Sequence, residues 1–301
     1  MKFTHLAAAL AFGTSGAAQA AIDIQFDFTY DSSSFFASAE RLTALDAAAS
    51  VFETRFADTL SAIVSSGSNS FDTVFFNPSA PSTHITLTQA SVAADVLRVY
   101  VGAANLGSTS LGLGGPGGFQ CSGFGSFCAD ASNRGQGDVS GSDAVDFAPW
   151  GGAISFNSTV DWHFGPTTFG LESGKADFYS VAVHELAHVL GFGTSDSFAR
   201  HVSGSSFFGP AAMAVHGGAV PMNDDAHWFD GTFSVVNGVP QEAAMDPAIR
   251  FGTRKNFTDL DYAAMRDLGW EVTPVPEAET WAMMLAGLGL VGMAVARRRT
   301  L

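Results

Sequence analysis

Five consecutive residues of the chain carry groups that can bind a metal ion and move a proton. They read His-Glu-Leu-Ala-His, from His184 to His188. On an α-helix, positions i and i+4 lie on one face, so His184 and His188 can present imidazole nitrogens to one ion. Glu185 lies beside that face and can reach a water on the metal. The pattern predicts a zinc site, because zinc lowers the pKa of bound water towards about 7 and polarises a carbonyl, while Glu185 transfers the proton.

The surrounding residues favour a helix that is held firmly in a fold. Asp177 stands where a helix cap is expected, and Gly191 stands where the helix would end. Apolar residues lie on either side of the histidines, namely Val181, Leu186, Val189 and Leu190. This context favours a helix from about 177 to 190 over a surface helix that merely carries two histidines.

The segment from His184 to Gly191, HELAHVLG, resembles the metzincins and, more loosely, their matrixin-like branch. A glycine three residues after the second histidine lets the chain turn, so that a third ligand can return from downstream. Gly152 to Asn157, followed by Trp162, resembles that branch's edge strand and turn. The resemblance covers about residues 150–270. It implies an α+β, metzincin-like zincin with a mixed twisted sheet, an active-site helix and a smaller irregular C-terminal lobe. It also implies that substrate binds as a strand added to that edge.

The third metal ligand does not follow from the compact metzincin signature, which has a histidine where this chain has Thr194. Leishmanolysin-like metzincins deliver the third histidine after a long insertion, and by that resemblance His227 is the preferred candidate. The alternatives that remain open are His216, His201 and Asp196.

By the same resemblance, Met245, within the segment 243–247, corresponds to the family's Met-turn beneath the zinc. An ordinary core methionine is the alternative. His163 is expected to flank the cleft, and Arg134 to brace an irregular loop. Tyr262 and His201 are conceivable transition-state donors, although no spacing supports either.

Periodicity predicts several regular elements. The expected strands span residues 22–28, 84–87, 96–101 and 154–156, and the expected further helices span residues 42–63 and 259–268. Two long stretches, residues 102–153 and 193–240, show no periodicity and are expected to be irregular.

The first irregular stretch contains the two cysteines of the chain, Cys121 and Cys128. In an exported protein, two cysteines this close are expected to form a local disulfide, because two thiolates without nearby histidines leave a zinc site incomplete. Five oxygen-bearing residues follow, namely Asp130, Asn133, Asp138, Asp143 and Asp146. A solvated acidic loop is the preferred interpretation and Ca²⁺ binding the alternative, since no twelve-residue EF-hand pattern is present.

The ends of the chain carry targeting signals. Lys2, an apolar run and Ala18-Gln19-Ala20 predict a signal peptide over residues 1–20. The protease domain is then expected at residues 21–271, with an upper lobe to about 192 and a lower lobe at 193–271. A linker at 272–280 leads to a transmembrane or sorting tail at 281–301.

The tail resembles the PEP-CTERM sorting tails of Gram-negative bacteria. An apolar run from Trp281 to Ala296 precedes three arginines, and Val275-Pro276-Glu277 stands before it, with Ala278 in place of the usual second proline. The resemblance implies a sorting transpeptidase as partner and transient contact with the inner membrane. The expected location is the periplasm, the cell surface or the medium. A buried C-terminal helix is the alternative.

Composition limits the classes of function. The 301 residues are 47% hydrophobic and carry a net charge of −15, which excludes the basic face that nucleic-acid binding requires. The first hypothesis is an exported zinc endopeptidase acting on protein or peptide substrates. The second is a catalytically inactive surface or matrix protein on the same scaffold, and the third is hydrolysis of a non-peptide amide. The intact Glu185 favours the first.

Overall fold

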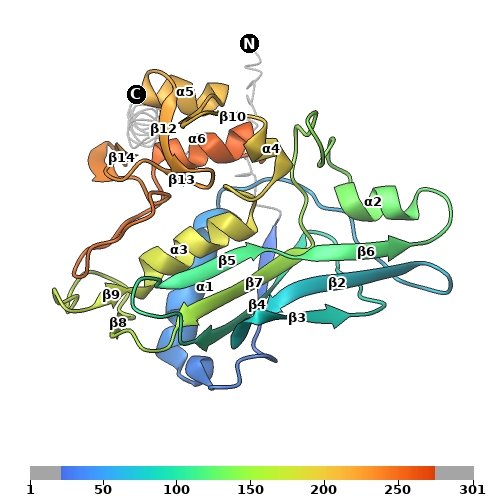
Figure 1. Ribbon diagram of the computed structural model, residues 1–301, viewed down its shortest axis with the longest axis horizontal. Helices are drawn as coiled ribbons and strands as arrows, with labels where there is room; N and C mark the ends of the chain where they lie inside the picture. The colour runs from blue at the N-terminus through green and yellow to red at the C-terminus, as the bar shows by residue number, and fades with distance from the viewer. Residues whose placement is uncertain (1–21, 275–301) are drawn as a thin grey trace, which may run out of the picture.

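The computed structural model describes residues 22–274 and shows a mixed α+β protein (Figure 1). The predicted signal peptide, the tail and residues 275–280 of the linker lie outside these residues. Within residues 22–274, no helix combines the length and apolar character needed to cross a membrane.

A four-stranded sheet in the order β1-β4-β7-β5 forms the centre of the fold. Its parallel strands are β1 (Asp23–Asp27), β4 (Val96–Ala104) and β7 (Gly151–Asn157). The last strand, β5 (Gly112–Pro116), runs antiparallel to β7 and forms an edge. Helices α1 (Ala39–Glu53) and α3 (Phe178–Val189) pack against each other, and α3 also packs on β5 and β7.

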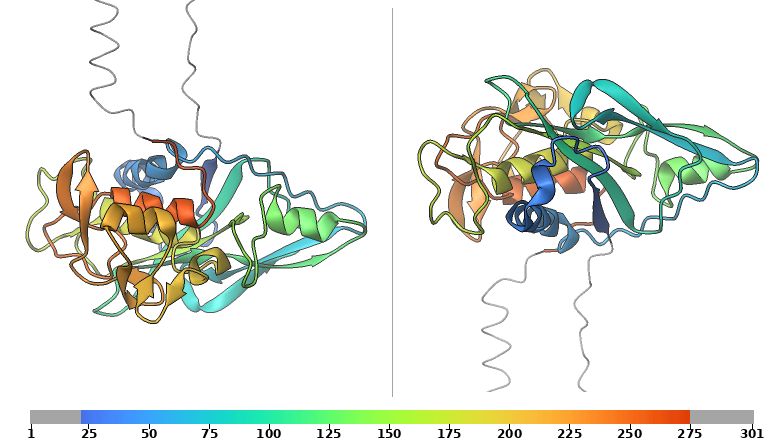
Figure 2. Two further views of the ribbon diagram at one scale, coloured as in Figure 1. Left: turned by 90° about the horizontal axis from the view of Figure 1, so that it is seen from above. Right: turned by 90° about the horizontal axis from the view of Figure 1, so that it is seen from below.

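The chain between these elements builds a second sheet at one end of the molecule (Figure 2). Its order is β3-β2-β6, with β2 at Ser70–Asn77, β3 at Ala80–Leu87 and β6 at Gly118–Ser122. Helix α2 (Phe127–Asn133) follows β6, and the predicted disulfide between Cys121 and Cys128 joins the two.

The C-terminal part contains short helices and small antiparallel sheets. The helices are α4 (Asp196–Ala199), α5 (Pro210–His216) and α6 (Asp259–Asp267). One sheet contains β10 (Val202–Ser203), β11 (Ser206–Phe207), β12 (Val220–Asp224) and β13 (His227–Trp228). A hairpin contains β14 (Phe233–Val236) and β15 (Val239–Glu242). A short parallel pair, β8 (Trp162–His163) and β9 (Ala176–Asp177), precedes α3, and a 3₁₀ turn, η1 (Phe35–Ala37), precedes α1.

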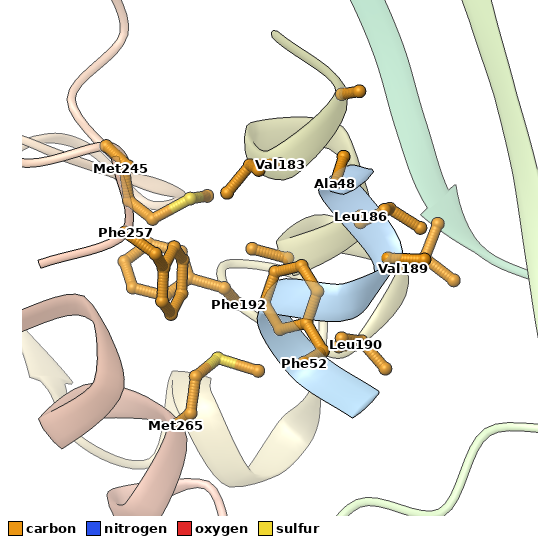
Figure 3. Close-up of a cluster of buried hydrophobic side chains, with 14 of the residues drawn as sticks. Ala48, Phe52, Val183, Leu186, Val189, Leu190, Phe192, Met245, Phe257 and Met265 are labelled. Atoms are coloured by element: carbon orange, nitrogen blue, oxygen red, sulfur yellow. The ribbon is translucent and has the colours of Figure 1, made fainter. Parts of the chain in front are cut away.

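One hydrophobic cluster joins the sheet, α1, α3 and the C-terminal part (Figure 3). Phe52 of α1 lies among Leu186, Val189 and Leu190 of α3, and all four side chains are at most 1% exposed. Met245 enters the same cluster from the other side and points toward α3. The helix that carries the histidines is therefore held by apolar packing on several faces.

Six predicted elements agree with the structure in type and approximate position. The strands at 22–28, 84–87, 96–101 and 154–156 correspond to β1, β3, β4 and β7, and the helices at 177–190 and 259–268 correspond to α3 and α6. Thr258 caps α6 and forms a reciprocal capping box with Asp261. Asp177 accepts a hydrogen bond from the Ser180 N–H and caps α3, as predicted.

The helix predicted for residues 42–63 is too long at its C-terminal end, because α1 stops at Glu53. Phe56 keeps its helical spacing but pairs instead with Val272, and the Ala57 N–H donates to the Glu271 carbonyl. Hydrogen bonds to a segment distant in the sequence thus override the local apolar period, while Phe56 remains buried.

The expectation that residues 102–153 and 193–240 are irregular is wrong. The first contains β5, β6 and α2, and the second contains α4, α5 and six short strands. Glycine has low strand propensity, so the sequence does not predict β5 as a strand. A Cβ at Gly114 would lie 2.5 Å from the Glu185 carbonyl oxygen. The strand is rich in glycine because α3 approaches its backbone closely.

The assignment of residues 152–157 to the edge strand is also wrong. All of β7 is buried, and it lies between β4 and β5. The sheet edge beside α3 is β5, which the sequence analysis did not identify as a strand.

Candidate metal centre

Three histidines from two elements meet at one point. His184 and His188 come from successive turns of α3, and His227 comes from β13. The His188 Nε2 lies 3.1 Å from the Nε2 of His184 and 3.1 Å from the Nε2 of His227. The three rings form a group whose ligand atoms all lie within 4.8 Å of one another. The structure thus brings together the predicted pair and the preferred third candidate.

The opposite nitrogen of each ring has a hydrogen-bond acceptor. The Nδ1–H of His184 donates to the Ala244 carbonyl (2.8 Å), and that of His188 donates to the Phe192 carbonyl (2.8 Å). The His227 Nδ1–H donates to the Asp224 carboxylate (2.9 Å). Since a carbonyl oxygen only accepts, the proton of each neutral ring resides on Nδ1. All three Nε2 atoms therefore present lone pairs to one another.

Facing lone pairs cannot form a hydrogen bond with one another, and a cation between them would relieve their repulsion. Burial and the neighbouring histidines lower the pKa of His184 well below its ordinary value, and burial and His227 lower that of His188 to about 4. Both rings are therefore neutral at pH 7. A tetrahedral zinc ion with bonds of roughly 2.0–2.1 Å would place its ligand atoms about 3.3 Å apart, close to the separations seen here. The donor set fits zinc.

Glu185 lies beside this group and beneath the edge strand. Its side chain is 7% exposed and contacts β5, where a Cβ at Gly112 would lie 2.6 Å from its Oε1. Burial raises the pKa of Glu185 to about 8, against a lowering contribution from the Gly114 backbone N–H. The glycines of β5 therefore let the carboxyl group occupy a space that any side chain would fill.

A turn from the C-terminal part supports the rings from below. The Ala244 carbonyl accepts from His184, and the Met245 carbonyl accepts from the Trp228 N–H (3.0 Å), next to His227. Met245 is fully buried in the hydrophobic cluster that includes α3. Its backbone thus joins the helical ligands to the third ligand.

Asp261 of α6 fixes this turn. Its carboxylate accepts from the Ala244 N–H (2.9 Å), from the Trp228 indole N–H (2.9 Å) and from the Thr258 N–H (2.8 Å). It has no exposed surface, and burial raises its pKa despite these bonds. The sequence analysis missed this role, although the Thr258-x-x-Asp261 spacing is a capping-box signal. It also missed Asp224, whose only signal is its place three residues before His227.

A pocket of about 420 Å³ opens beside the histidines. Its walls come from α3, from the segment before β5 and from the segment after Met245, and its apolar side chains are Val181, Leu111, Ile249 and Phe251. Arg254 pairs with Asp177 (2.7 Å), the capping residue of α3, and so fastens the last segment to the helix. His184, Glu185 and His227 all face this pocket.

A second group of possible metal ligands in residues 22–274 contains Asp230, Glu242 and Asp246. A protein cation already lies against it, because the Lys255 Nζ is 2.6 Å from Asp246 and 3.0 Å from Glu242. Lys255 neutralises much of the negative charge, so the group is explained as an internal ion-pair cluster.

The remaining candidates lie away from the histidine group. His201 contacts the Asp267 carbonyl, Asp196 accepts from the Gly141 N–H, and His216 ends α5 with an exposed side chain. None of the three belongs to the histidine group. The His163 Nε2 lies 2.8 Å from the Thr167 carbonyl oxygen. Tyr262 donates to the Val51 carbonyl and does not line the pocket, so it is no transition-state donor.

Arg134 has the bracing role predicted for it. It is fully buried and donates to four backbone carbonyls, those of Ser61, Ala93, Val96 and Pro149. Burial lowers its pKa to about 10. Of the acidic residues in the surrounding loop, Asp130 bonds to Ser126 and Asp146 to backbone N–H groups. Within residues 22–274 they form no group of three close ligands.

Comparison with known proteins identifies the tail. Residues 274–299 match the family model of the PEP-CTERM protein-sorting motif. The motif supports an exported protein directed to the cell envelope, with a sorting machinery that acts on the tail. No curated protein and no solved structure matches the chain significantly.

Proposed function

We propose that the protein is an exported, zinc-dependent endopeptidase with a metzincin-like catalytic domain. The observation that carries this proposal is the convergence of three unprotonated imidazole nitrogens beside the buried carboxyl group of Glu185. Three histidines with a neighbouring acid and an adjoining pocket are the donor set of a catalytic rather than a structural zinc site. The sorting motif supports export of the catalytic domain.

His184, His188 and His227 would hold the ion, and their Nδ1 bonds fix the ring orientation before metal binds. When bound, zinc supplies a Lewis acid that polarises the scissile carbonyl and makes water more acidic. A bound cation would favour the ionised form of Glu185 against the effect of burial, and the carboxylate would then accept the proton from water and deliver it to the leaving amine. Its position under β5 keeps it from exchanging freely with solvent.

The free edge of β5 would bind the peptide as an added strand. The Leu111 carbonyl accepts from the Asn157 N–H, and the Gly117 N–H donates to the Gly151 carbonyl. These two bonds show that the odd-numbered residues of this segment pair with β7. In an antiparallel pair the alternate residues direct their peptide groups outward. The open edge beside α3 is therefore formed by Gly112, Pro116 and the carbonyl of Gly114, because the Gly114 N–H already bonds to the Glu185 carboxyl group. The pocket next to the histidines, which is lined by both apolar and polar side chains, would take the side chain that follows the scissile bond.

The test uses purified mature protein loaded with zinc. We expect about one zinc per chain and cleavage of unfolded casein. Glu185→Gln should retain the metal and lose cleavage by about 10²–10⁴-fold, the usual contribution of a general base. Glu172→Gln, at an exposed residue of the same type, is the matched control. Zinc binding with no cleavage of casein or of a diverse peptide library would favour the inactive scaffold, and the absence of zinc binding would sink the proposal.

A further inference from the structure

A second hollow lies at the opposite end of the edge strand from the histidine pocket. Its volume is about 190 Å³, and it lies between β6, α2 and the segment 139–150. Its walls are mainly apolar, formed by Phe71, Pro116, Phe119, Val139, Phe147 and Trp150. None of the described residues that line it is charged. A cavity of roughly 150 Å³ is sufficient for a benzene ring, so this one accommodates an aromatic side chain.

The hollow and the histidine pocket share one strand. Leu111 and Gly112 line the histidine pocket, and Pro116 and Gly117 line the hollow. Figure 1 shows β5 leading directly into β6, with α2 beside β6. From Gly112 to Pro116 the strand covers about 13 Å at ~3.3 Å per residue. A peptide paired with β5 that passes the histidines therefore also reaches the hollow.

The direction of such a peptide follows from the pocket proposed for the residue after the scissile bond and from the course of α3. The histidine pocket is lined by Ser180 and Val181, before the histidines, whereas the hollow is lined by Phe147, which packs on Gly191 after them. A Cβ at Gly191 would lie 2.5 Å from the Phe147 ring. The hollow thus lies near the C-terminal end of α3. The pocket proposed for the residue after the scissile bond lies near the other end of this helix. The hollow would face residues on the N-terminal side of that bond.

We propose that this hollow is a substrate subsite for an aromatic or branched aliphatic side chain about four to six residues before the scissile bond. The inference rests on the proposed function and names its preferred substrates as extended, apolar-rich segments of unfolded protein. Phe119 is 43% exposed at the hollow, which leaves apolar surface in water until a substrate covers it. An N-terminal apolar anchor would hold the chain in register along β5.

The experiment measures binding separately from cleavage. Zinc-loaded Glu185→Gln protein is titrated with labelled peptides that carry a single Phe at the fourth, fifth or sixth residue before the scissile position, and with an all-Ser reference. We expect one Phe peptide to bind about tenfold more tightly than the reference, the usual effect of burying an aromatic side chain. Equal binding of all four peptides would overturn the proposal.

Two variants locate the preference. Val139→Asp places a charge on the wall, and Ser132→Phe fills the hollow from α2, so each should remove the tenfold preference and leave reference binding unchanged. Val145→Asp, at a residue of the same loop that is 51% exposed and outside the hollow, should keep it. Persistence of the preference in both wall variants overturns the proposal. Preference in binding without any cleavage by the wild-type chain would leave the subsite standing and reject the peptidase.

Discussion

The two halves of the histidine group are built in different ways. His184 and His188 lie on one face of a single helix, so local geometry alone sets their relation. His227 comes from a two-residue strand 39 positions later, and its place depends on β12, on the turn at Met245 and on α6. The two helical ligands therefore come together wherever the helix forms, whereas the third ligand joins them only in the complete fold.

The supporting contacts differ in the same manner. The helical half is held by apolar packing on α1 and by the glycines of β5. The other half is held by hydrogen bonds that converge on Asp261. A substitution in the apolar packing removes some of many contacts, whereas a substitution of the central acceptor in a buried polar network removes several hydrogen bonds at once. Substitutions in the two halves should therefore have distinct consequences.

The largest effect is expected for Asp261→Ala. The change leaves the N–H groups of Ala244, Trp228 and Thr258 buried without an acceptor, at a cost of about 3–5 kcal/mol in the free energy of unfolding. Denaturant unfolding measures this loss. Asp259→Ala, at an exposed acid in the same helical turn, should cost less than about 1 kcal/mol. Equal effects of the two substitutions would show that Asp261 does not hold the turn.

Substitution of the edge strand should affect the helical half. In Gly114→Ala the new Cβ would lie 2.5 Å from the Glu185 carbonyl oxygen, so strand and helix must separate, at about 1–3 kcal/mol. Gly115→Ala, where nothing lies within 4 Å, is the matched control and should be nearly neutral. Thermal unfolding compares the two proteins, and an unaffected Gly114→Ala would contradict the close packing.

Asp224→Asn tests the third ligand without disturbing the fold. Loss of the carboxylate that orients His227 should weaken zinc binding by about 10–100-fold. Asp225→Asn removes the same charge from the neighbouring exposed position, so it controls for electrostatics. Competition with a chelator measures both affinities. Identical affinities would mean that His227 needs no orientation by Asp224, and would weaken its assignment as a ligand.

The smallest effect concerns a region remote from both halves. Asp58 is 2% exposed and accepts from the Glu271 N–H, and burial raises its pKa to about 6, above its ordinary value of 3.8. Because the folded pKa is the higher one, the folded state favours the protonated form. The resulting stability is complete below pH 3.8 and is lost as pH rises through 6.

The wild-type protein should therefore lose up to about 2 kcal/mol of its free energy of unfolding between pH 4 and pH 7. Asp58→Asn should abolish this loss. Comparing the melting temperatures of the two proteins across this range measures the difference. Zinc affinity should be the same in both, because Asp58 contacts neither half of the histidine group. A parallel pH dependence of the two proteins would contradict the raised pKa.

Several parts of the site depend on local spacing and could be predicted from the sequence. One helical turn places His184 and His188 together, Asp177 and Gly191 bound the helix, and Thr258 starts α6. The mixed α+β class and the bracing role of Arg134 could also be predicted. The choice of His227 came from a family resemblance, because spacing alone left His216, His201 and Asp196 open.

Other features depend on residues that are distant in the sequence and meet only in the folded protein. Tertiary contacts end α1 at Glu53 by pairing Phe56 with Val272, and they put β5 at the sheet edge in place of β7. The glycines of β5 have no strand propensity, and their use lies in the close approach of α3. Asp261 shows the same limit, since a capping residue can be recognised locally but the three groups it holds come from elsewhere. Local patterns report one element at a time, whereas a site made from several elements forms only when they pack.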